Sequence, residues 1–135
     1  MARVLGVLGG MGPAATTAFL ARVQALTPAG ADEDHVRVIA DINPQVPNRH
    51  TQPEAAGRTL GEMARALKTA GAQVLAMPCN TAHAHAGAIR AAGLPFIDMI
   101  AETAKAAGAT GARRVGVLAT PGAALLYAEA LAAEG

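Results

Sequence analysis

The amino-acid sequence is poor in aromatic residues, in charge and in cysteine. Its 135 residues include no tryptophan, two phenylalanines and one tyrosine, and charged residues make up only 16%. Valine, leucine, isoleucine, methionine and alanine must therefore build the core, so we expect closely packed elements. The formal net charge is +1 without a basic block, which argues against nucleic acid or an anionic membrane surface as a partner. A hydrophobic fraction of 52% is typical of a folded domain.

Cysteine occurs once, as Cys79. A single cysteine cannot form an internal disulfide, and a strand pattern directly follows Met1-Ala2-Arg3 without a signal peptide. Both features predict a cytoplasmic location. His83 and His85 lie two residues apart on a predicted helix, so they do not share a face, and no acidic residue or second cysteine is near in the sequence. We therefore expect ordinary helix histidines and no metal site, with His83 as a residue that could line the pocket.

Short apolar runs alternate with alanine-rich helical stretches. Strands are predicted at 3–8, 36–42, 73–77, 95–98 and 114–119, and helices at 13–26, 51–71, 100–109 and 123–133, with a short helix ending near residue 93. Thr51 and Glu54 have the spacing of a capping box, with Thr51 as the N-cap. The alternation predicts an α/β fold, in which helices cover both faces of a parallel sheet through right-handed crossovers.

The unusual segments of the chain all follow predicted strands. A glycine loop at 9–12 follows the first strand, a proline- and asparagine-rich loop at 43–49 the second, residues 78–81 the third, and residues 120–122 the last. Ligands of parallel α/β sheets bind outside the carboxyl ends of the strands. We therefore expect these four segments to form one site.

Two interpretations of Cys79 are open. Free cysteine is often a small buried hydrophobic residue. At a strand-to-helix junction, however, the unpaired amides and the helix dipole favour a thiolate. Asn80 and Thr81 are good N-cap residues, and their side chains could also reach a ligand. A reactive thiolate is the use of Cys79 that explains the whole cluster.

The glycine loop and Arg49 also allow alternatives. Gly10, Gly12 and Ala15 fit the loose dinucleotide fingerprint, with Asp41 as the acid that ends the second strand. The same loop also suits a nest of amides for a carboxylate, or a plain tight turn. Arg49 offers a planar fork that binds a carboxylate through two hydrogen bonds, or it is a solvated surface residue.

Five segments together resemble the aspartate/glutamate racemase family. They are GGMGPAAT at 9–16, NPQVPNR at 43–49, MPCNTAH at 77–83, MIAETA at 99–104 and LAT at 118–120. The resemblance implies cofactor-independent racemisation of an acidic amino acid by two cysteines, and Cys79 matches one of them. It implies that Asn80, Thr81 and the amides of Gly10, Met11 and Gly12 bind the α-carboxylate, and that Arg49 binds the side-chain carboxylate. Gln45 and Thr120, which lie in two of these segments, are the remaining expected substrate contacts.

The sequence also departs from the family pattern of two similar lobes. Residues 1–110 correspond to a first lobe, and residues 111–135 to the first strand and helix of a second. The Gly-Cys-Thr segment of the second cysteine is absent, and Ala123 replaces the last threonine of a Thr-x-Gly-Thr segment. We therefore expect an incomplete racemase whose exposed strand edge and apolar helix residues lead to homo-oligomers.

Two other functions stay open from the sequence. A dinucleotide-binding domain would need Asp41 to bind a ribose, and it leaves Cys79 unexplained. A catalytically inactive binder of acidic ligands keeps Arg49 and the glycine loop but leaves Cys79 idle.

Overall fold

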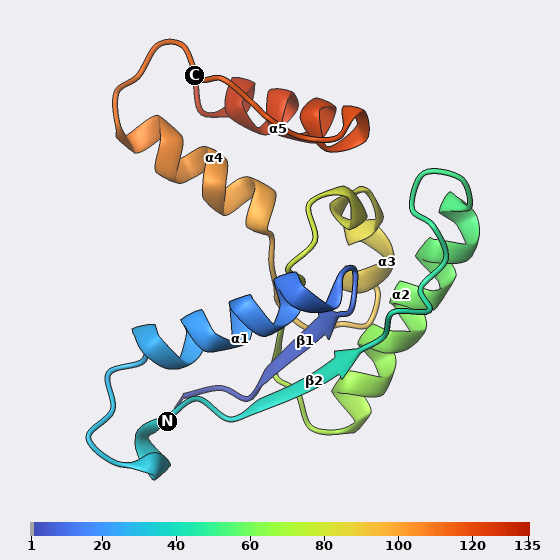
Figure 1. Ribbon diagram of the computed structural model, residues 1–135, viewed down its shortest axis with the longest axis vertical. Helices are drawn as coiled ribbons and strands as arrows, with labels where there is room; N and C mark the ends of the chain where they lie inside the picture. The colour runs from blue at the N-terminus through green and yellow to red at the C-terminus, as the bar shows by residue number, and fades with distance from the viewer. Residues whose placement is uncertain (1) are drawn as a thin grey trace.

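A four-stranded parallel sheet forms the centre of the computed structural model, which describes residues 2–135 (Figure 1). The strand order is β2-β1-β3-β4. The strands are β1 (Leu5–Gly9), β2 (Val38–Ile42), β3 (Val74–Ala76) and β4 (Phe96–Ile97). The helices are α1 (Pro13–Leu26), α2 (Pro53–Thr69), α3 (Ala86–Arg90), α4 (Met99–Ala109) and α5 (Pro121–Ala133), with 3₁₀ turns η1 (Asp32–Asp34) and η2 (Thr81–His85).

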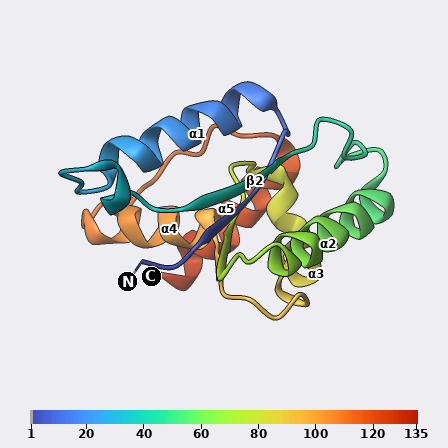
Figure 2. The same ribbon diagram turned by 90° about the horizontal axis from the view of Figure 1, so that it is seen from below.

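Helices cover both faces of the sheet, as predicted. Figure 2 shows α1 on one face and α2 and α3 on the other. The α2 side holds the larger cluster of buried residues, which includes Leu8, Leu60, Leu75 and Ile89. The α1 side holds a smaller cluster around Leu5, Val7 and Ala76. The predicted α/β fold class is therefore confirmed.

Close packing around β1 explains the small residues there. All five residues of β1 are buried. A Cβ atom added at Gly6 would lie 2.7 Å from the Cβ of Ala72 and 2.8 Å from a methyl carbon of Leu75. Any side chain at Gly6 would push these residues away from the strand. A core with few aromatic residues is thus packed by bringing the backbones close together.

The first four predicted strands form, each slightly shorter than its apolar run. The prediction that Thr51 caps the second long helix is wrong. That helix begins at Pro53 and its N-cap is Gln52, without a side-chain capping bond. Proline suits the first helical position because it has no N–H to satisfy. The amide of Thr51 instead donates to Oδ1 of Asn48, in a turn that precedes the helix.

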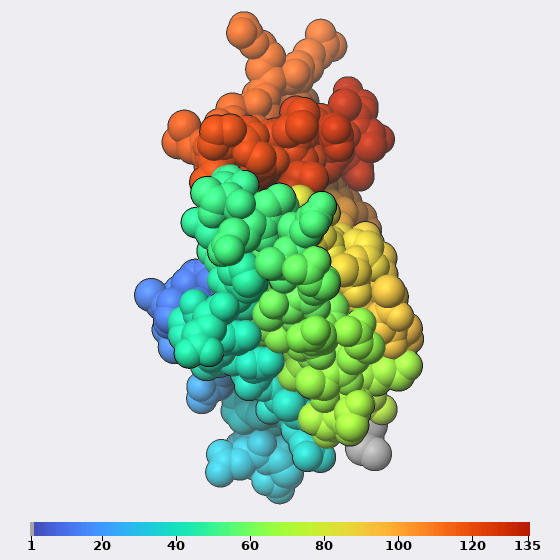
Figure 3. Space-filling view, turned by 90° about the vertical axis from the view of Figure 1, so that its right-hand side faces the viewer, coloured from blue at the N-terminus to red at the C-terminus, as the bar shows by residue number. Residues whose placement is uncertain are grey.

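The predicted strand at 114–119 is also wrong. These residues form no strand, and all of them are exposed, Leu118 completely (104%). An extended segment becomes a strand only when a neighbour pairs with its amides and carbonyls, and none of the strands within residues 2–135 does so. Figure 3 shows the orange segment before α5 projecting from one end of the molecule. The predicted lobe boundary after residue 110 falls in the turn that opens this segment.

The last helix, α5, begins at Pro121 rather than at residue 123 and packs along α4 (Figure 1). Across the described residues, 2–135, every helix is too short or too polar to cross a membrane.

Candidate active site

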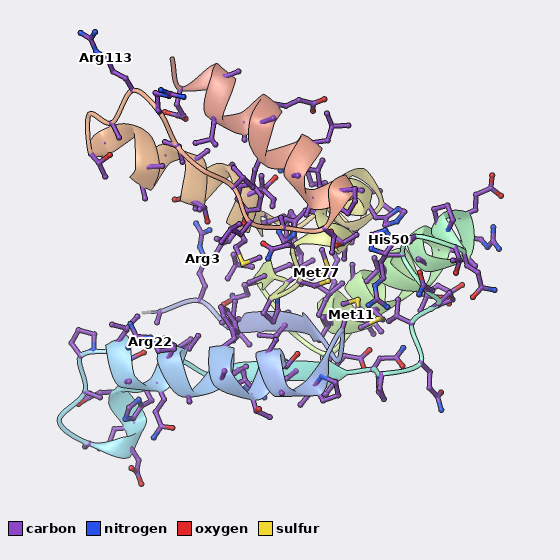
Figure 4. The ribbon with its side chains drawn as sticks, turned by 45° about the horizontal axis from the view of Figure 1, so that its top comes forward. Arg3, Met11, Arg22, His50, Met77 and Arg113 are labelled. Carbon is purple, nitrogen blue, oxygen red and sulfur yellow. The ribbon has the colours of Figure 1, made fainter. Side chains whose placement is uncertain are left out.

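The carboxyl ends of the four strands meet at one edge of the sheet. From β1 the chain crosses to β2 on one side, and from β3 it crosses to β4 on the other. The glycine loop after β1 and the Cys79 loop after β3 therefore flank the point where the strand order reverses. In open α/β sheets this point is the usual position of a ligand site. Met11 and Met77, labelled in Figure 4, come from these two loops and lie near the middle of the molecule.

Thr16 holds the glycine loop in place. The loop turns at Gly10, where φ is +96° and an added Cβ would lie 2.4 Å from the backbone of Asn43, so only glycine fits. The amide of Gly10 donates to Oγ1 of Thr16 at 2.9 Å, and this hydroxyl donates to the carbonyl of Gly12 at 3.2 Å. The amide of Gly10 is thus not free for a ligand, contrary to the expected nest. The amides of Met11 and Gly12 donate to no other group of residues 2–135.

Cys79 follows β3 and is a half-buried, free thiol beside the main core cluster. Its amide donates to the carbonyl of Met77 at 2.9 Å, which makes the loop a tight turn. The regular α-helix expected directly after Cys79 is not formed, because the five-residue 3₁₀ turn η2 stands there before the short α3. A single short turn has little dipole, so the argument from a long helix does not apply to this thiol.

Asn80 and Thr81 are hydrogen bonded to α5, which lies about 40 residues later in the chain. The hydroxyl of Tyr127 donates to Oδ1 of Asn80 at 2.6 Å. The hydroxyls of Thr81 and Thr120 are 2.9 Å apart, and Thr120 is also the N-cap of α5. Thr120 therefore reaches the edge as expected, although the strand predicted before it is absent. Tyr127 was not among the predicted site residues, and the one feature that sets it apart in the sequence is that it is the single tyrosine.

Arg49 and Gln45 lie in the loop after β2 and form no hydrogen bond to the Cys79 loop among residues 2–135. Nη1 of Arg49 donates to the carbonyls of Val46 at 3.4 Å and Pro47 at 3.5 Å. None of the carboxylates in the described part of the chain pairs with Arg49. Most of the donors of this guanidinium are therefore available, while the long contacts keep it near its own loop.

His83 connects the Cys79 loop to the start of α4. The ring is buried (5% exposed), and its Nδ1 lies 2.6 Å from the carbonyl oxygen of Cys79. Its Nε2 lies 3.2 Å from the amide nitrogen of Met99, which donates to it. The ring stacks on Phe96 at a centroid distance of 5.4 Å. The sequence suggested only an ordinary helix histidine that could line a pocket.

Burial lowers the pKa of His83, and this effect exceeds the opposing effects of the Cys79 carbonyl and the Asp98 carboxylate. Burial alone would raise the pKa of Asp98, but hydrogen bonds from the Ala101 amide and from Arg90, at 3.0 and 3.1 Å, help to lower it. We therefore assign a neutral imidazole and an ionised Asp98 near neutral pH. In residues 2–135 no three His, Cys, Asp or Glu side chains come together as metal ligands.

The chain is a parallel α/β lobe with a free thiol and open loop amides at its switch point, which is the position where open α/β sheets bind their ligands. A family described as Asp/Glu/hydantoin racemase has a model that matches residues 8–135, and the chain belongs to this family. The match runs from the end of β1 to the last residue of the chain, beyond α5.

Individual relatives agree with this assignment. The broad specificity amino-acid racemase RacX of Bacillus subtilis (strain 168) is 30% identical over 76% of this chain, and the match covers 48% of RacX. The aspartate racemase of Picrophilus torridus is 28% identical with a TM-score of 0.87, over 98% of this chain and 59% of the other. An aspartate racemase homologue from Pyrococcus horikoshii OT3 has a TM-score of 0.82 at 22% identity over 98% of this chain and 62% of the other, which shows the fold alone. The chain thus spans about half the length of the curated relative.

Proposed function

We propose that this chain acts in the racemisation of an acidic amino acid, with Cys79 as the base on one face of the α-carbon. The observation that carries the proposal is a free, half-buried thiol in the loop after β3, at the switch point of the sheet, followed directly in the chain by Asn80 and Thr81. Membership of the racemase family and the likeness to an aspartate racemase support it.

The chemistry needs a base and a stabilised carbanion. The thiolate of Cys79 takes the α-proton, and the electrons of the broken C–H bond move onto the α-carbon and its carboxylate. In the proposal, the amides of Met11 and Gly12 and the side chains of Asn80 and Thr81 hold that carboxylate. Donors that are fixed before the reaction stabilise the developing charge without reorganisation. No electron sink such as pyridoxal phosphate enters this scheme.

Racemisation also needs an acid on the opposite face of the substrate. The 135 residues contain no second cysteine, so they supply no second thiol for that face. We infer that the described chain alone exchanges the α-proton mainly on one face, with retained configuration. A working thiolate also requires a reducing compartment, which is the basis for proposing a cytoplasmic location.

Proton exchange in deuterated water tests the proposal directly. The α-proton signals of L-aspartate, D-aspartate, L-glutamate and L-alanine would be followed by NMR. We expect loss of the signal for one enantiomer of an acidic substrate, and no loss with Cys79→Ser. A matched control carries Cys79→Ser together with Thr69→Cys, which keeps one thiol at an exposed position at the far end of α2. Exchange by this control at the wild-type rate would remove Cys79 from the mechanism.

Arg49 is proposed to bind the side-chain carboxylate. Arg49→Lys should weaken aspartate binding about tenfold, because the planar pair of donors is lost while the charge stays. Arg58→Lys, at an exposed position of α2, is the matched control and should bind as the wild type does. Calorimetry measures both, and equal affinities would remove Arg49 from the site.

The catalytically inactive binder is separated by the same experiments, because it would bind aspartate with no exchange and with equal affinity in Cys79→Ser. The dinucleotide alternative has less support. The Gly10 amide, which such a loop would offer to a pyrophosphate, is already bonded to Thr16. Calorimetry with NAD would show binding if that alternative holds.

A further inference from the structure

Both ring nitrogens of His83 are engaged by the main chain, and this defines the state of the ring. A carbonyl oxygen only accepts hydrogen bonds, so Nδ1, 2.6 Å from the Cys79 oxygen, must carry the proton. A backbone amide only donates, so Nε2, 3.2 Å from the Met99 nitrogen, must present its lone pair. The geometry therefore requires the neutral ring with its proton on Nδ1.

The surroundings of His83 support this state. Phe96 stacks on the ring, and Arg90 in turn lies 5.5 Å from the Phe96 centroid. The charged groups that face the ring are Asp98 at the start of α4, Arg90 at the end of α3, and Glu129 of α5, which lines the same small cavity. A second proton on the ring would point Nε2–H at the Met99 amide and break that bond.

The two bonds join segments that carry different parts of the site. The carbonyl of Cys79 belongs to the loop that presents the thiol, and Met99 is the first residue of α4. The backbone amide of Cys79 donates to the carbonyl of Met77, which lies in the same loop and so does not connect Cys79 to another element. His83 thus fixes the backbone of Cys79 itself to a separate element of the fold, in addition to the bonds that Asn80 and Thr81 form with α5 and its N-cap.

We propose that His83 is the positioning residue of Cys79: as a neutral ring protonated on Nδ1, it holds the Cys79 carbonyl and the Met99 amide together and so fixes where the thiol lies. The importance of this position for catalysis rests on the proposed function. His83 itself touches no substrate in this scheme.

Two variants separate the two bonds. In His83→Asn the side-chain amide lies where Nδ1 was, so it can still donate to the Cys79 carbonyl, but the Met99 amide loses its acceptor. In His83→Gln the amide reaches the Nε2 position and can accept from Met99, but the Cys79 carbonyl loses its donor. His85→Asn and His85→Gln are matched controls, since His85 is half-buried, two residues away, and forms no hydrogen bond through its side chain within residues 2–135.

Alkylation of Cys79 by iodoacetamide measures the position of the thiol without turnover. Release of the loop should expose the half-buried thiol, so His83→Gln should react about five to ten times faster, the equivalent of one lost hydrogen bond. His83→Asn should also react faster than the wild type, because without the bond to Met99 the loop is no longer joined to α4. Both His85 variants should stay within about twofold of the wild type. In the same His83→Gln protein, deuterium exchange into the substrate should fall by a similar factor. Faster alkylation combined with slower deuterium exchange would show that the thiol is still present but misplaced.

The ring state can be read in the wild-type protein, so the proposal does not depend on any variant folding. Nitrogen-15 NMR of the histidine side chains should show His83 as a slow-exchanging neutral ring with its proton on Nδ1 at pH 7. A ring protonated on Nε2, or His83→Gln labelling at the wild-type rate, would overturn the proposal. Absence of deuterium exchange in the wild type, together with the expected ring state and labelling rates, would instead contradict the proposed function and leave the positioning of Cys79 supported.

Discussion

Replacing Thr16 by valine tests whether one buried hydroxyl holds the glycine loop. Valine has the shape of threonine and a similar helix propensity, so the change removes only the hydroxyl. The side chain of Thr16 is fully buried, and its oxygen is the acceptor for the Gly10 amide at 2.9 Å. A buried donor left without a partner costs about 1–3 kcal/mol. The carbonyl of Gly12 keeps the backbone amide of Thr16 as a donor, so little further cost arises there. We expect a loss of about 2 kcal/mol in the free energy of unfolding.

Urea denaturation measures this loss. With a slope of about 2 kcal/mol per molar urea, the midpoint should fall by about 1 M at unchanged slope. Thr16→Ser keeps the hydroxyl and removes one buried methyl group, which should cost about 0.8 kcal/mol. Thr17→Val is the matched control, because the Thr17 hydroxyl is exposed and bonds only to the carbonyl of Ala14. The reasoning is refuted if Thr16→Val lies within about 0.5 kcal/mol of Thr17→Val.

Three further predictions follow from single features of the structure. Gly10→Ala should destabilise the fold by at least about 2 kcal/mol, because φ is +96° and the new Cβ meets the backbone of Asn43. Gly12→Ala has open space around it and should cost under about 1 kcal/mol. Thermal unfolding compares the two variants, and equal costs would contradict the loop geometry. Because the pKa of His83 is lowered in the folded state, its contribution to stability is present above the unfolded pKa of about 6.5 and is lost as pH falls toward 5. In urea titrations from pH 7 to 5, the free energy of unfolding should therefore fall more steeply for the wild type than for His83→Gln. The fully exposed Leu118 should promote self-association, so sedimentation should show fewer oligomers for Leu118→Lys than for the wild type, and an equal distribution would exclude this residue from the contact.

Hydrophobic runs in the sequence predicted the first four strands, because β1 and β3 form the largely buried middle of the sheet and β2 and β4 each pair with one of them. The run at 114–119 has the same composition, yet it stays outside the sheet, since a strand also requires a pairing partner. The helix cap at Thr51 was wrong for a related reason. Thr51, Gln52 and Pro53 all suit a helix start, and only the turn around Asn48 decides which residue begins the helix.

The sequence alone predicted which segments of the candidate site follow strand ends. Cys79, the glycine loop and the loop of Arg49 come after apolar runs, and parallel strands place such loops at one edge. Local patterns could not show that the amide of Gly10 is occupied. That fact depends on the hydroxyl of Thr16, which points back from the first turns of α1.

The family and the α/β order of the chain were thus determined by the sequence itself, through composition, periodicity and the residues after each strand. The partners of Cys79 and its neighbours were decided only by the tertiary structure. Tyr127 reaches Asn80 and Met99 reaches His83 because α4 and α5 pack back onto the loop after β3. A hydrogen bond is sensitive to changes of a few tenths of an ångström in the distance between donor and acceptor. Here donor and acceptor lie in segments far apart in the chain, and no local pattern of residues encodes their distance.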